Sequence, residues 1–382
     1  MLRFLHSSDW QLGMSRRFLA GEAQERFAAA RLDAISAIGE LARRTGAAFV
    51  VVAGDVFETN QVSARTLARA LDKLATVPVP VYLLPGNHDP LDAGSIYRQA
   101  AFLRACPPHV RVLDGEDPRR VPEVDGVELL GAPWPGKHPA EDLCARALAR
   151  AAPPERGIRR ILVGHGIVDA LDPARERLEA ISLAGLEAAL ASGRCAYVAL
   201  GDRHSATALG ARGAVRYSGA PEPTDFDEIA SGRVLEVELG DEGDPLVQEH
   251  AIGTWSFRYL ERELTGEEDL RGLEQVLREI PAKDRCVAKL ALRGALSLEE
   301  TAALEALLED LRASFAALLR HERAEALSLR PETLDPQALA LSGYALQTWR
   351  ALEGEAAGEG EAAAIARDAL VLFHRLARES ER

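Results

Sequence analysis

The chain has 382 residues, of which 47% are hydrophobic, and its formal net charge at pH 7 is -14. This length exceeds what one hydrophobic core usually holds, so we expect two or three domains. The acidic charge excludes a surface that binds nucleic acid everywhere. It is compatible with a local binding site, because metal-binding carboxylates inflate the negative count.

The four cysteines lie far apart and show no C-x-x-C spacing, which argues against a disulfide framework and a thiolate zinc site. The N-terminus lacks the apolar core of a signal peptide, and no stretch approaches the ~20 apolar residues that a bilayer-spanning helix requires. We therefore expect a cytoplasmic protein with no membrane attachment. None of the lysines lies in a G-x-x-x-x-G-K-[ST] motif, so the chain carries no P-loop of its own.

Residues 1–250 alternate short β-branched runs with helical, Ala-rich segments, a pattern typical of a layered α/β domain. Apolar periodicity predicts helices over residues 22–44 and 62–75, and Gly46 is expected to end the first of them. Strand-like runs without a metal-binding residue occupy residues 110–113, 127–130, 215–217 and 234–239.

Five other apolar runs of this region each lead into a residue that can bind a metal ion. In chain order these residues are Asp9, Asp55, Asn87, His165, and Asp202 with His204. Taken singly, each of them could cap a turn or be an ordinary satisfied polar group. Glycine directly precedes four of them, which permits the tight turns and close backbone approach that a metal site needs. Together they predict one metal centre built from several strand ends.

The donor atoms of this predicted centre are oxygens and imidazole nitrogens, with no sulfur among them. Such a set favours manganese, with magnesium or iron as alternatives, over a structural zinc site. Two divalent ions ~3.5 to 4 Å apart, bridged by one carboxylate, can orient and activate a water for attack on a phosphate ester.

After residue 250 the composition turns to loop residues, and a small β-α-β-α module follows up to about residue 330. Capping boxes are predicted to open its helices at residues 265–268 and 297–300. Residues 331–382 are expected to be helical, with a break over residues 353–361. We therefore divide the chain into domains at residues 1–250, 251–330 and 331–382.

Apolar residues share one face of the last predicted helix, namely Ile365, Ala369, Leu372, Phe373 and Leu376. Packing on the protein's own core is the simplest explanation of that face. A docking helix for a partner protein is the alternative.

Five segments of this chain resemble, in order, the motifs of the calcineurin-like metallophosphoesterases. They are residues 8–13, 54–58, 86–89, 164–165 and 201–204. The residues that follow Asp9 and Asp55, and the run at residues 217–221, more closely resemble the SbcD-type DNA-repair nucleases of that superfamily. The resemblance implies a four-layer αββα sandwich with a small α/β capping domain and C-terminal helices.

When the family's ligand positions are transferred to the matching motifs of this chain, the resemblance implies that the first metal is held by Asp9, Gln11, Asp55 and His204. The second metal would then be held by Asp55, Asn87, His165 and Asp202, with Asp55 bridging the two ions. His88 would contact the scissile phosphate and help the leaving oxygen depart, and Asp89 would orient His88. Arg203 could face a phosphate, although an ordinary surface arginine is the alternative.

Two positions depart from the family, which usually has histidine at residues 11 and 202. Gln11 can offer only a neutral carbonyl oxygen, whereas Asp202 adds a negative charge. We expect weaker binding of the first metal and a harder second site. An altered but working centre is the favoured interpretation, and a degenerate, mainly structural centre is the alternative.

The resemblance further implies a manganese-dependent nuclease of double-strand-break repair, with exonuclease action on DNA ends and endonuclease action on single strands or hairpins. It implies a homodimer that works with an SbcC-like coiled-coil ATPase, which agrees with the missing P-loop. Two alternatives stand beside it: a phosphodiesterase of small molecules, and a catalytically weakened subunit that bridges DNA ends or regulates the ATPase.

Overall fold

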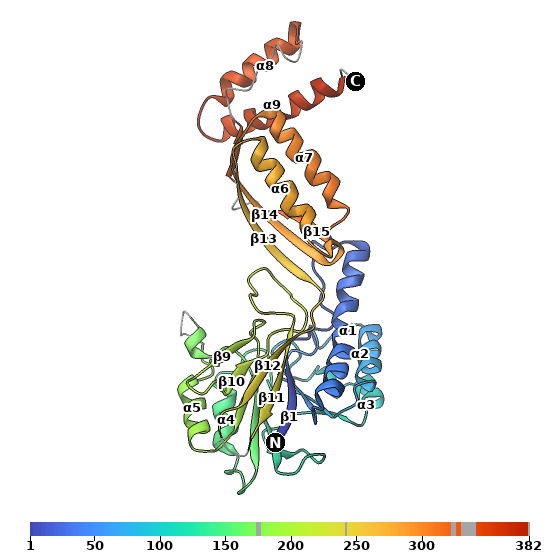
Figure 1. Ribbon diagram of the computed structural model, residues 1–382, viewed down its shortest axis with the longest axis vertical. Coiled ribbons are helices and arrows are strands. Elements are labelled where there is room, and N and C mark those ends of the chain that lie inside the picture. The colour runs from blue at the N-terminus through green and yellow to red at the C-terminus, as the bar shows by residue number, and fades with distance from the viewer. Residues whose placement is uncertain (173–176, 241–242, 322–325, 330–340, 381–382) are drawn as a thin grey trace. The chain divides into compact units, whose positions relative to one another are not determined.

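The computed structural model describes residues 1–172, 177–240, 243–321, 326–329 and 341–380, and is drawn in Figure 1. The chain divides into two compact units, Met1–Trp255 and Ser256–Arg382. The first unit therefore runs five residues beyond the predicted boundary at residue 250. Within the described residues, no helix combines the length and the apolar character needed to cross a bilayer.

Two six-stranded sheets form the centre of the first unit. The first sheet consists, in spatial order, of β12 (Leu246–Ala251), β11 (Arg233–Leu239), β1 (Leu2–Ser7), β2 (Val50–Val52), β3 (Val81–Leu83) and β4 (Val110–Val112). The second consists of β5 (Arg119–Arg120), β6 (Val127–Gly131), β7 (Arg159–His165), β8 (Tyr197–Gly201), β10 (Val215–Tyr217) and β9 (Thr207–Leu209).

Helices cover the outer face of each sheet, which gives the first unit four layers (Figure 1). On the first sheet lie α1 (Gly21–Thr45), α2 (Ala64–Ala75) and α3 (Ala100–Ala105), and on the second lie α4 (Leu143–Arg150) and α5 (Leu183–Ala191). Between the sheets, Phe4 packs on Phe49 and Tyr197 with ring centroids 5.1 and 5.6 Å apart. The predicted αββα sandwich is confirmed.

Local sequence signals account for the two long helices of this unit. Both predicted helices form with bounds within two residues of the prediction. Gly46 ends α1 in the left-handed conformation at φ 67°, and its N–H donates to the carbonyl of Ala42. Short 3-10 helices occupy Ile96–Arg98 and Asp169–Leu171.

The parallel arrangement of the central strands brings their carboxyl ends to one edge. In the first sheet Ser7, Val52 and Leu83, the last residues of β1, β2 and β3, are neighbours in the ladder. In the second sheet His165 of β7 pairs with Gly201 of β8. Residues that follow these strands therefore emerge together, as ligand-binding residues commonly do in α/β sheets.

The second unit is a smaller α/β module. Its sheet joins β13 (Ser256–Leu264), β14 (Cys286–Leu296) and β15 (Ala317–Arg320), and β16 (Ala326–Leu329) pairs with β14. Leucines from α6 (Glu267–Glu279) and α7 (Leu298–Arg312) pack on one face of that sheet. A 3-10 helix at Lys283–Arg285 precedes β14.

One of the two predicted capping boxes forms. Ser297 accepts from the N–H of Glu300, and the Glu300 carboxylate accepts from the N–H of Ser297. The other prediction is wrong in its residues: α6 begins one residue later, and Asp269 instead accepts from both the N–H and the hydroxyl of Thr265.

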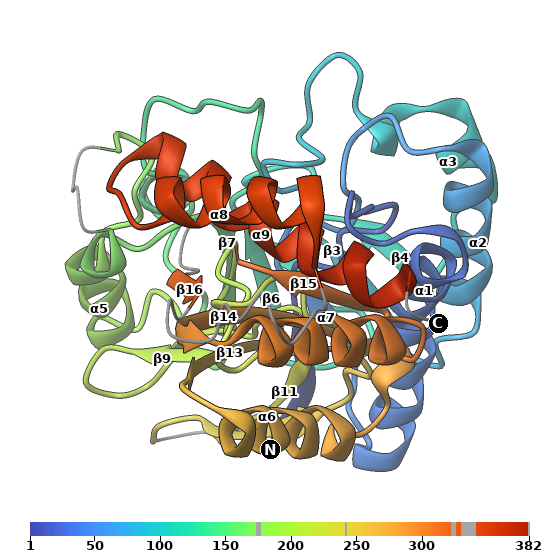
Figure 2. The ribbon, with the colours of Figure 1, turned by 90° about the horizontal axis from the view of Figure 1, so that it is seen from above.

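Two helices lie side by side at the end of the second unit, α8 (Gly343–Ala356) and α9 (Glu361–Ser380) (Figures 1 and 2). The helical break is shorter than predicted, because α8 continues through Ala356. Trp349 of α8 is fully buried and packs in one cluster with Leu298 and Leu370. Residues 330–340, which contain the start of the predicted third domain, lie outside the described residues.

The apolar face predicted for the last helix is only partly buried. Ile365 and Leu372 are 62% and 47% exposed, and Leu376 is 53% exposed. The helix instead buries Ala363, Ala366 and Leu370. Packing on the protein's own core, the simplest explanation of the whole predicted face, is therefore confirmed for Phe373, whose ring packs edge-on against Trp349, and wrong for Ile365, Leu372 and Leu376.

Candidate metal centre

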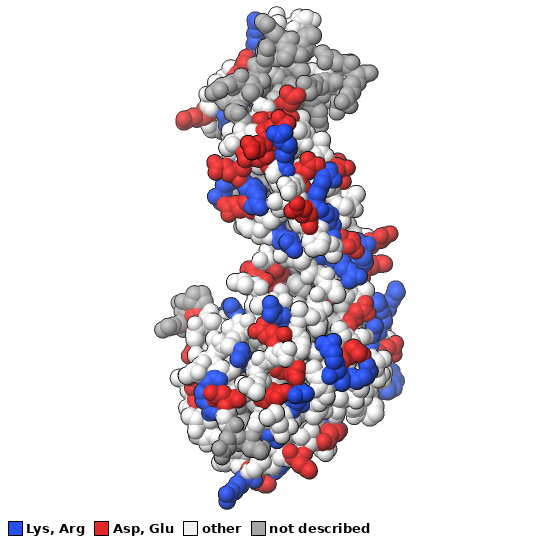
Figure 3. Space-filling view, viewed as in Figure 1, with Lys and Arg blue, Asp and Glu red and all other residues white. Residues whose placement is uncertain are grey.

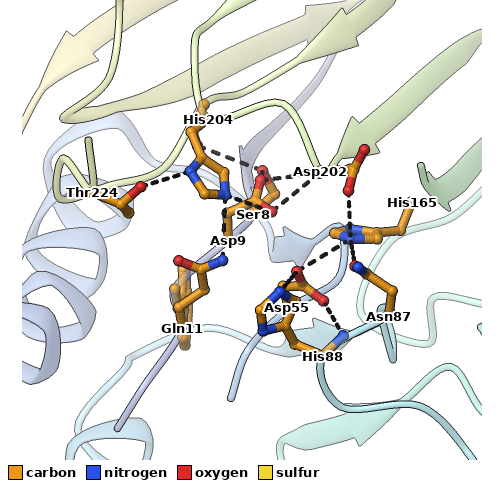
Figure 4. Close-up of polar contacts among 12 residues, drawn as sticks. Ser8, Asp9, Gln11, Asp55, Asn87, His88, His165, Asp202, His204 and Thr224 are labelled. Carbon is orange, nitrogen blue, oxygen red and sulfur yellow. Dashed lines mark hydrogen bonds and ion pairs between the residues drawn. The ribbon is translucent and has the colours of Figure 1, made fainter. Parts of the chain in front are cut away.

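The five apolar runs that lead into potential metal-binding residues converge where the carboxyl ends of the central strands meet (Figure 4). We call this end of the two sheets the edge. The first sheet contributes the residues that follow β1, β2 and β3, namely Asp9, Gln11, Asp55, Asn87 and His88. The second sheet contributes the last residue of β7 and two residues after β8, namely His165, Asp202 and His204. Residues as far apart as 195 positions in sequence thus share one site.

The backbone at this edge is strained where the polar side chains project. Four site residues have left-handed φ angles, Asp9 at 55°, Gln11 at 45°, Asp55 at 53° and Asp202 at 94°. Among the described residues, Ala282 is the one other non-glycine in that region. Such conformations disfavour most side chains and cluster at functional sites, so this concentration supports a functional role for the edge.

Two glycines are required by the close packing of this edge. A Cβ on Gly54 would lie 2.1 Å from Nδ1 of His165, and Gly54 itself has a φ of 92°. A Cβ on Gly86 would lie 2.2 Å from Oδ1 of Asp55. The glycines before the predicted ligands therefore serve the close approach expected from the sequence.

One half of the site contains Asp9, Gln11 and His204. Asp9 is fully buried, and it accepts hydrogen bonds from the Ser8 hydroxyl at 2.5 Å and from the N–H of Asp202 at 3.1 Å. Nε2 of His204 lies 3.8 Å from Oδ1 of Asp9 and 3.3 Å from Nε2 of Gln11. The other end of that amide, Oε1 of Gln11, is buried and has no hydrogen-bond partner among the described residues.

The opposite nitrogen of the His204 ring is held from outside the predicted set. Nδ1 lies 2.8 Å from Oε1 of Glu228 and 2.8 Å from the hydroxyl oxygen of Thr224. Sequence reasoning missed both residues, because they lie several positions beyond the end of β10, in the loop that leads to β11, and carry no recognisable motif spacing to His204.

The other half of the site contains Asn87, His165 and Asp202. Nδ1 of His165 donates to the carbonyl of Ala53 at 2.8 Å, so that Nε2 faces the site. This Nε2 lies 3.4 Å from Oδ2 of Asp55 and 3.8 Å from Oδ1 of Asp202. The Asn87 amide lies 2.8 Å from the same nitrogen, and with its NH2 group turned inward it donates to both oxygens of Asp55.

Asp55 stands between the two halves. Carboxylate oxygens of Asp9 and Asp55 and a nitrogen of His165 all lie within 4.8 Å of one another. Both imidazoles are hydrogen-bonded through Nδ1, which directs Nε2 towards these carboxylates. Oxygen and imidazole donors in this arrangement, together with the orphaned oxygen of Gln11, fit hard or borderline divalent cations.

Buried charges at the edge shift one another's titration. Burial raises the pKa of Asp9. Burial alone would lower the pKa of His204, but the hydrogen bond to Glu228 and the charge of Asp9 outweigh it and raise that pKa to about 9. His165 likewise has a raised pKa, because the charge of Asp55 and their hydrogen bond outweigh burial. Surplus negative charge here is what divalent cations would neutralise.

His88 lies at the rim, partly exposed beside Asp55. Its N–H donates to Oδ1 of Asp55 at 2.9 Å, and its Nδ1 donates to the carbonyl of Glu58 at 3.0 Å. Nε2 is left facing Oδ2 of Asp55 at 4.0 Å. The ring is therefore oriented by a backbone carbonyl rather than by Asp89 as predicted.

Asp89 has a different place in the structure. Its buried carboxylate accepts from the N–H of Phe57 at 3.0 Å, from the N–H of Gly86 at 2.8 Å and from the hydroxyl of Tyr97 at 2.5 Å. It thereby ties the loop after β2 to the loop after β3. Burial and the nearby Asp55 charge raise the pKa of Asp89 to about 6.

Arg203 is exposed, and its Nε donates to the hydroxyl of Thr207 at 2.8 Å. It contacts none of the converging residues through the hydrogen bonds and ion pairs of the described chain. Its predicted contact with a phosphate stays a prediction.

Comparison with known proteins places this edge in a family context. The family model described as calcineurin-like phosphoesterase matches residues 2–204, a span that contains every predicted site residue. The chain is 27% identical over 264 residues to the SbcD component of the nuclease SbcCD from two Escherichia coli strains. That alignment covers 61% of this chain and 64% of the relatives, so the chain spans less than two thirds of their length.

Solved structures show only distant likeness. A dimetal phosphatase from Danio rerio is 12% identical with a TM-score of 0.41, over 64% of this chain and 98% of that one. A Thermus thermophilus protein is 13% identical with a TM-score of 0.40, over 65% of this chain and 98% of that one.

Proposed function

This chain belongs to the calcineurin-like phosphoesterase family, and on that premise we propose that it is a two-metal nuclease that hydrolyses phosphodiester bonds of DNA. The observation that carries the proposal is the convergence of carboxylate, amide and imidazole donors around Asp55 at one sheet edge. Two divalent ions, manganese foremost, would be held there.

The two halves of the site support a division of ligands between the ions. Asp9, Gln11 and His204 would hold the first ion, and Asn87, His165 and Asp202 the second, with Asp55 shared. When bound, the ions supply Lewis acidity and lower the pKa of a water molecule. The reaction adds that water's oxygen to phosphorus and breaks the bond from phosphorus to the ester oxygen, which leaves with a proton.

The residues at the rim would act on the substrate. His88 is partly exposed, and its Nδ1 is tied to the Glu58 carbonyl, so its Nε2 is the ring atom available to the scissile phosphate. We assign to it contact with that phosphate and assistance to the leaving oxygen. Arg203 is proposed to contact a neighbouring phosphate. Asp89 holds the loop that carries His88.

Similarity to the Escherichia coli nuclease component supports DNA as the substrate. We propose exonuclease action on DNA ends, endonuclease action on single strands or hairpins, and a cytoplasmic role in double-strand-break repair. On the face drawn in Figure 3, acidic and basic side chains are interspersed. We therefore propose that DNA contacts the protein locally, at the candidate metal centre, rather than over that whole face.

The exposed residues of α9 support a partner protein. Ile365 and Leu372 lie seven residues apart, hence on one helix face, and both are about half exposed or more. We propose that this face docks an SbcC-like coiled-coil ATPase and that the nuclease works as a homodimer.

The deciding experiment incubates the purified full chain with Mn²⁺ and end-labelled linear duplex or hairpin DNA, alone and with the ATPase partner. Wild type should release nucleotides or cut the hairpin, and His88→Ala should be inactive while binding metal normally. Equal inertness of both proteins under every metal and with the partner present would contradict the nuclease proposal. Rapid hydrolysis of a chromogenic diester without DNA cleavage would favour a small-molecule phosphodiesterase instead.

A further inference from the structure

His204 is the one imidazole of the metal centre whose second nitrogen is held by side chains. Its Nδ1 lies 2.8 Å from a carboxylate oxygen of Glu228, which comes 24 residues later in the chain. His165, by contrast, is held by the backbone carbonyl of Ala53. A side-chain partner can be changed by substitution, so its contribution is open to test.

The Glu228 carboxylate is itself held in place. The hydroxyl of Thr224 donates to Oε1, and the N–H of Thr224 donates to Oε2 at 2.8 Å. The side chain of Glu228 is only 5% exposed. Both oxygens are therefore engaged, and the carboxylate presents a fixed acceptor to the ring of His204.

The loop that carries these two residues is anchored at several points. Arg31, buried in α1, donates to the carbonyl of Pro223 and to the carbonyl of Trp10, which lies between the site residues of the first loop. Glu222 accepts from the N–H groups of Thr254 and Trp255. Glu228 thus belongs to a rigid frame around the site rather than to a mobile surface loop.

We propose that Glu228, held by Thr224, is the positioning residue of His204 and sets the affinity of the first metal. This inference rests on the proposed function. A carboxylate on Nδ1 keeps the proton on that nitrogen, fixes the ring orientation and makes Nε2 a better donor. The dependence is strong in this chain because its companion ligand Gln11 is a weak neutral donor.

The test is a Mn²⁺ titration of the metal-free full chain, with free Mn²⁺ followed by electron paramagnetic resonance. Glu228→Ala should weaken one bound Mn²⁺ about 10- to 100-fold and leave the other within about twofold. Glu228→Gln keeps an acceptor for Nδ1 and should recover most of the loss. Thr224→Val removes the hydroxyl at constant shape and should give an intermediate loss.

Asp227→Asn is the matched control, because Asp227 is an exposed carboxylate one position away. It should bind Mn²⁺ as wild type does. The proposal is overturned if Glu228→Ala leaves every Mn²⁺ affinity unchanged, weakens all bound ions equally, or matches Asp227→Asn. Thermal unfolding of the metal-free variants separates a loss of fold from a loss of Mn²⁺ affinity. If Glu228→Ala misfolds, the Mn²⁺ affinities of Thr224→Val and Glu228→Gln test the proposal instead.

The inference and the proposed function fail separately. Selective loss of one Mn²⁺ in Glu228→Ala, in a protein that cuts no DNA, would support the positioning role and contradict the nuclease. DNA cleavage by wild type, with Mn²⁺ binding unaffected by Glu228→Ala, would support the nuclease and contradict the positioning role.

Discussion

At the scale of single residues, Gln11 determines how the first half of the site can hold a cation. Its backbone lies in the left-handed region, its Nε2 lies 3.3 Å from Nε2 of His204, and its oxygen is buried without a hydrogen-bond partner in the described part of the chain. The side chain is therefore already directed at the site, and the chemistry of its end group limits binding.

We predict that Gln11→His tightens one of the two bound Mn²⁺ ions by about tenfold, or ~1.4 kcal/mol, because imidazole is a better donor than a neutral amide. Isothermal titration of metal-free protein would measure the change. Gln61→His, which adds an imidazole at an exposed position, is the control. Unchanged or weaker binding in Gln11→His would argue against its assignment as a ligand.

His6 shows that a histidine near the motifs can be purely structural. It is fully buried, its Nε2 donates to the carbonyl of Leu200, and its Nδ1 accepts from the hydroxyl of Tyr197. Burial, only partly offset by the bond to Leu200, lowers its pKa to about 3.

The unfolded chain therefore binds a proton at this residue below about pH 6.5, whereas the folded chain does so only near pH 3. Stability that is present above pH 6.5 is lost as the pH falls, by about 2 kcal/mol at pH 5. Urea unfolding at pH 7.5 and pH 5 should show this loss reduced in His6→Gln. Exposed His138→Gln should keep the wild-type loss; equal losses in all three proteins would refute the prediction.

At the scale of elements, the loops after β2 and β3, which carry residues of the candidate metal centre, are tied to one another by buried polar groups. Asp89 collects donors from the loop after β2, from the loop after β3, and from Tyr97 in a 3-10 helix. These bonds hold Asp55 and His88 in a fixed relation, because each loop carries one of them.

Tyr97→Phe removes one hydrogen bond to the buried Asp89 carboxylate, and we expect it to lower the free energy of unfolding by about 2 kcal/mol. Chemical denaturation followed by circular dichroism would measure the difference. Tyr344→Phe, at a residue that is 84% exposed, should change stability by less than about 0.5 kcal/mol. Similar effects of the two substitutions would contradict the role assigned to Tyr97.

The α9 helix has two apolar faces, one buried in the second unit and one exposed. Leu370 packs with Trp349, whereas Ile365 and Leu372 remain exposed. We predict that the double change Ile365→Glu and Leu372→Glu leaves the fold intact but abolishes co-purification with the ATPase partner. Leu103→Glu, at a residue of α3 that is 64% exposed, is the control. Retained association in the double variant would exclude this face as the docking site.

At the scale of the whole molecule, the candidate metal centre lies entirely within the unit Met1–Trp255. A ligand that binds only the folded form stabilises it by about 2.7 kcal/mol at a hundredfold excess over Kd. We predict that Mn²⁺ raises the unfolding temperature of the first unit alone, and that EDTA reverses the shift.

Calorimetry would resolve the two transitions, and tryptophan fluorescence would assign them. Trp10, Trp134 and Trp255 report on the first unit and Trp349 on the second, so Trp349→Phe silences the second transition in fluorescence. An equal shift of both transitions would contradict the placement of the metal in one unit.

Local signals in the sequence determined which residues could form the centre. Each apolar run ends within a few positions of a side chain that can bind a metal ion, so Asp9, Asp55, Asn87 and His165 could be proposed as ligands from their sequence neighbours alone. The same holds for α1 with its stop at Gly46 and for the Ser297 capping box. These features depend on the backbone conformation of a few consecutive residues, which the sequence specifies directly.

Tertiary structure decided which partners those residues meet. Glu228 reaches His204 from a loop, Asp89 binds Tyr97 and Phe57 instead of His88, and α9 buries Leu370 rather than Leu372. The number of residues that separates these partners in the sequence does not predict that they lie close together in space. Such contacts arise only when the packing of sheets and helices fixes segments far apart in the chain against one another, which periodicity and motif spacing do not describe.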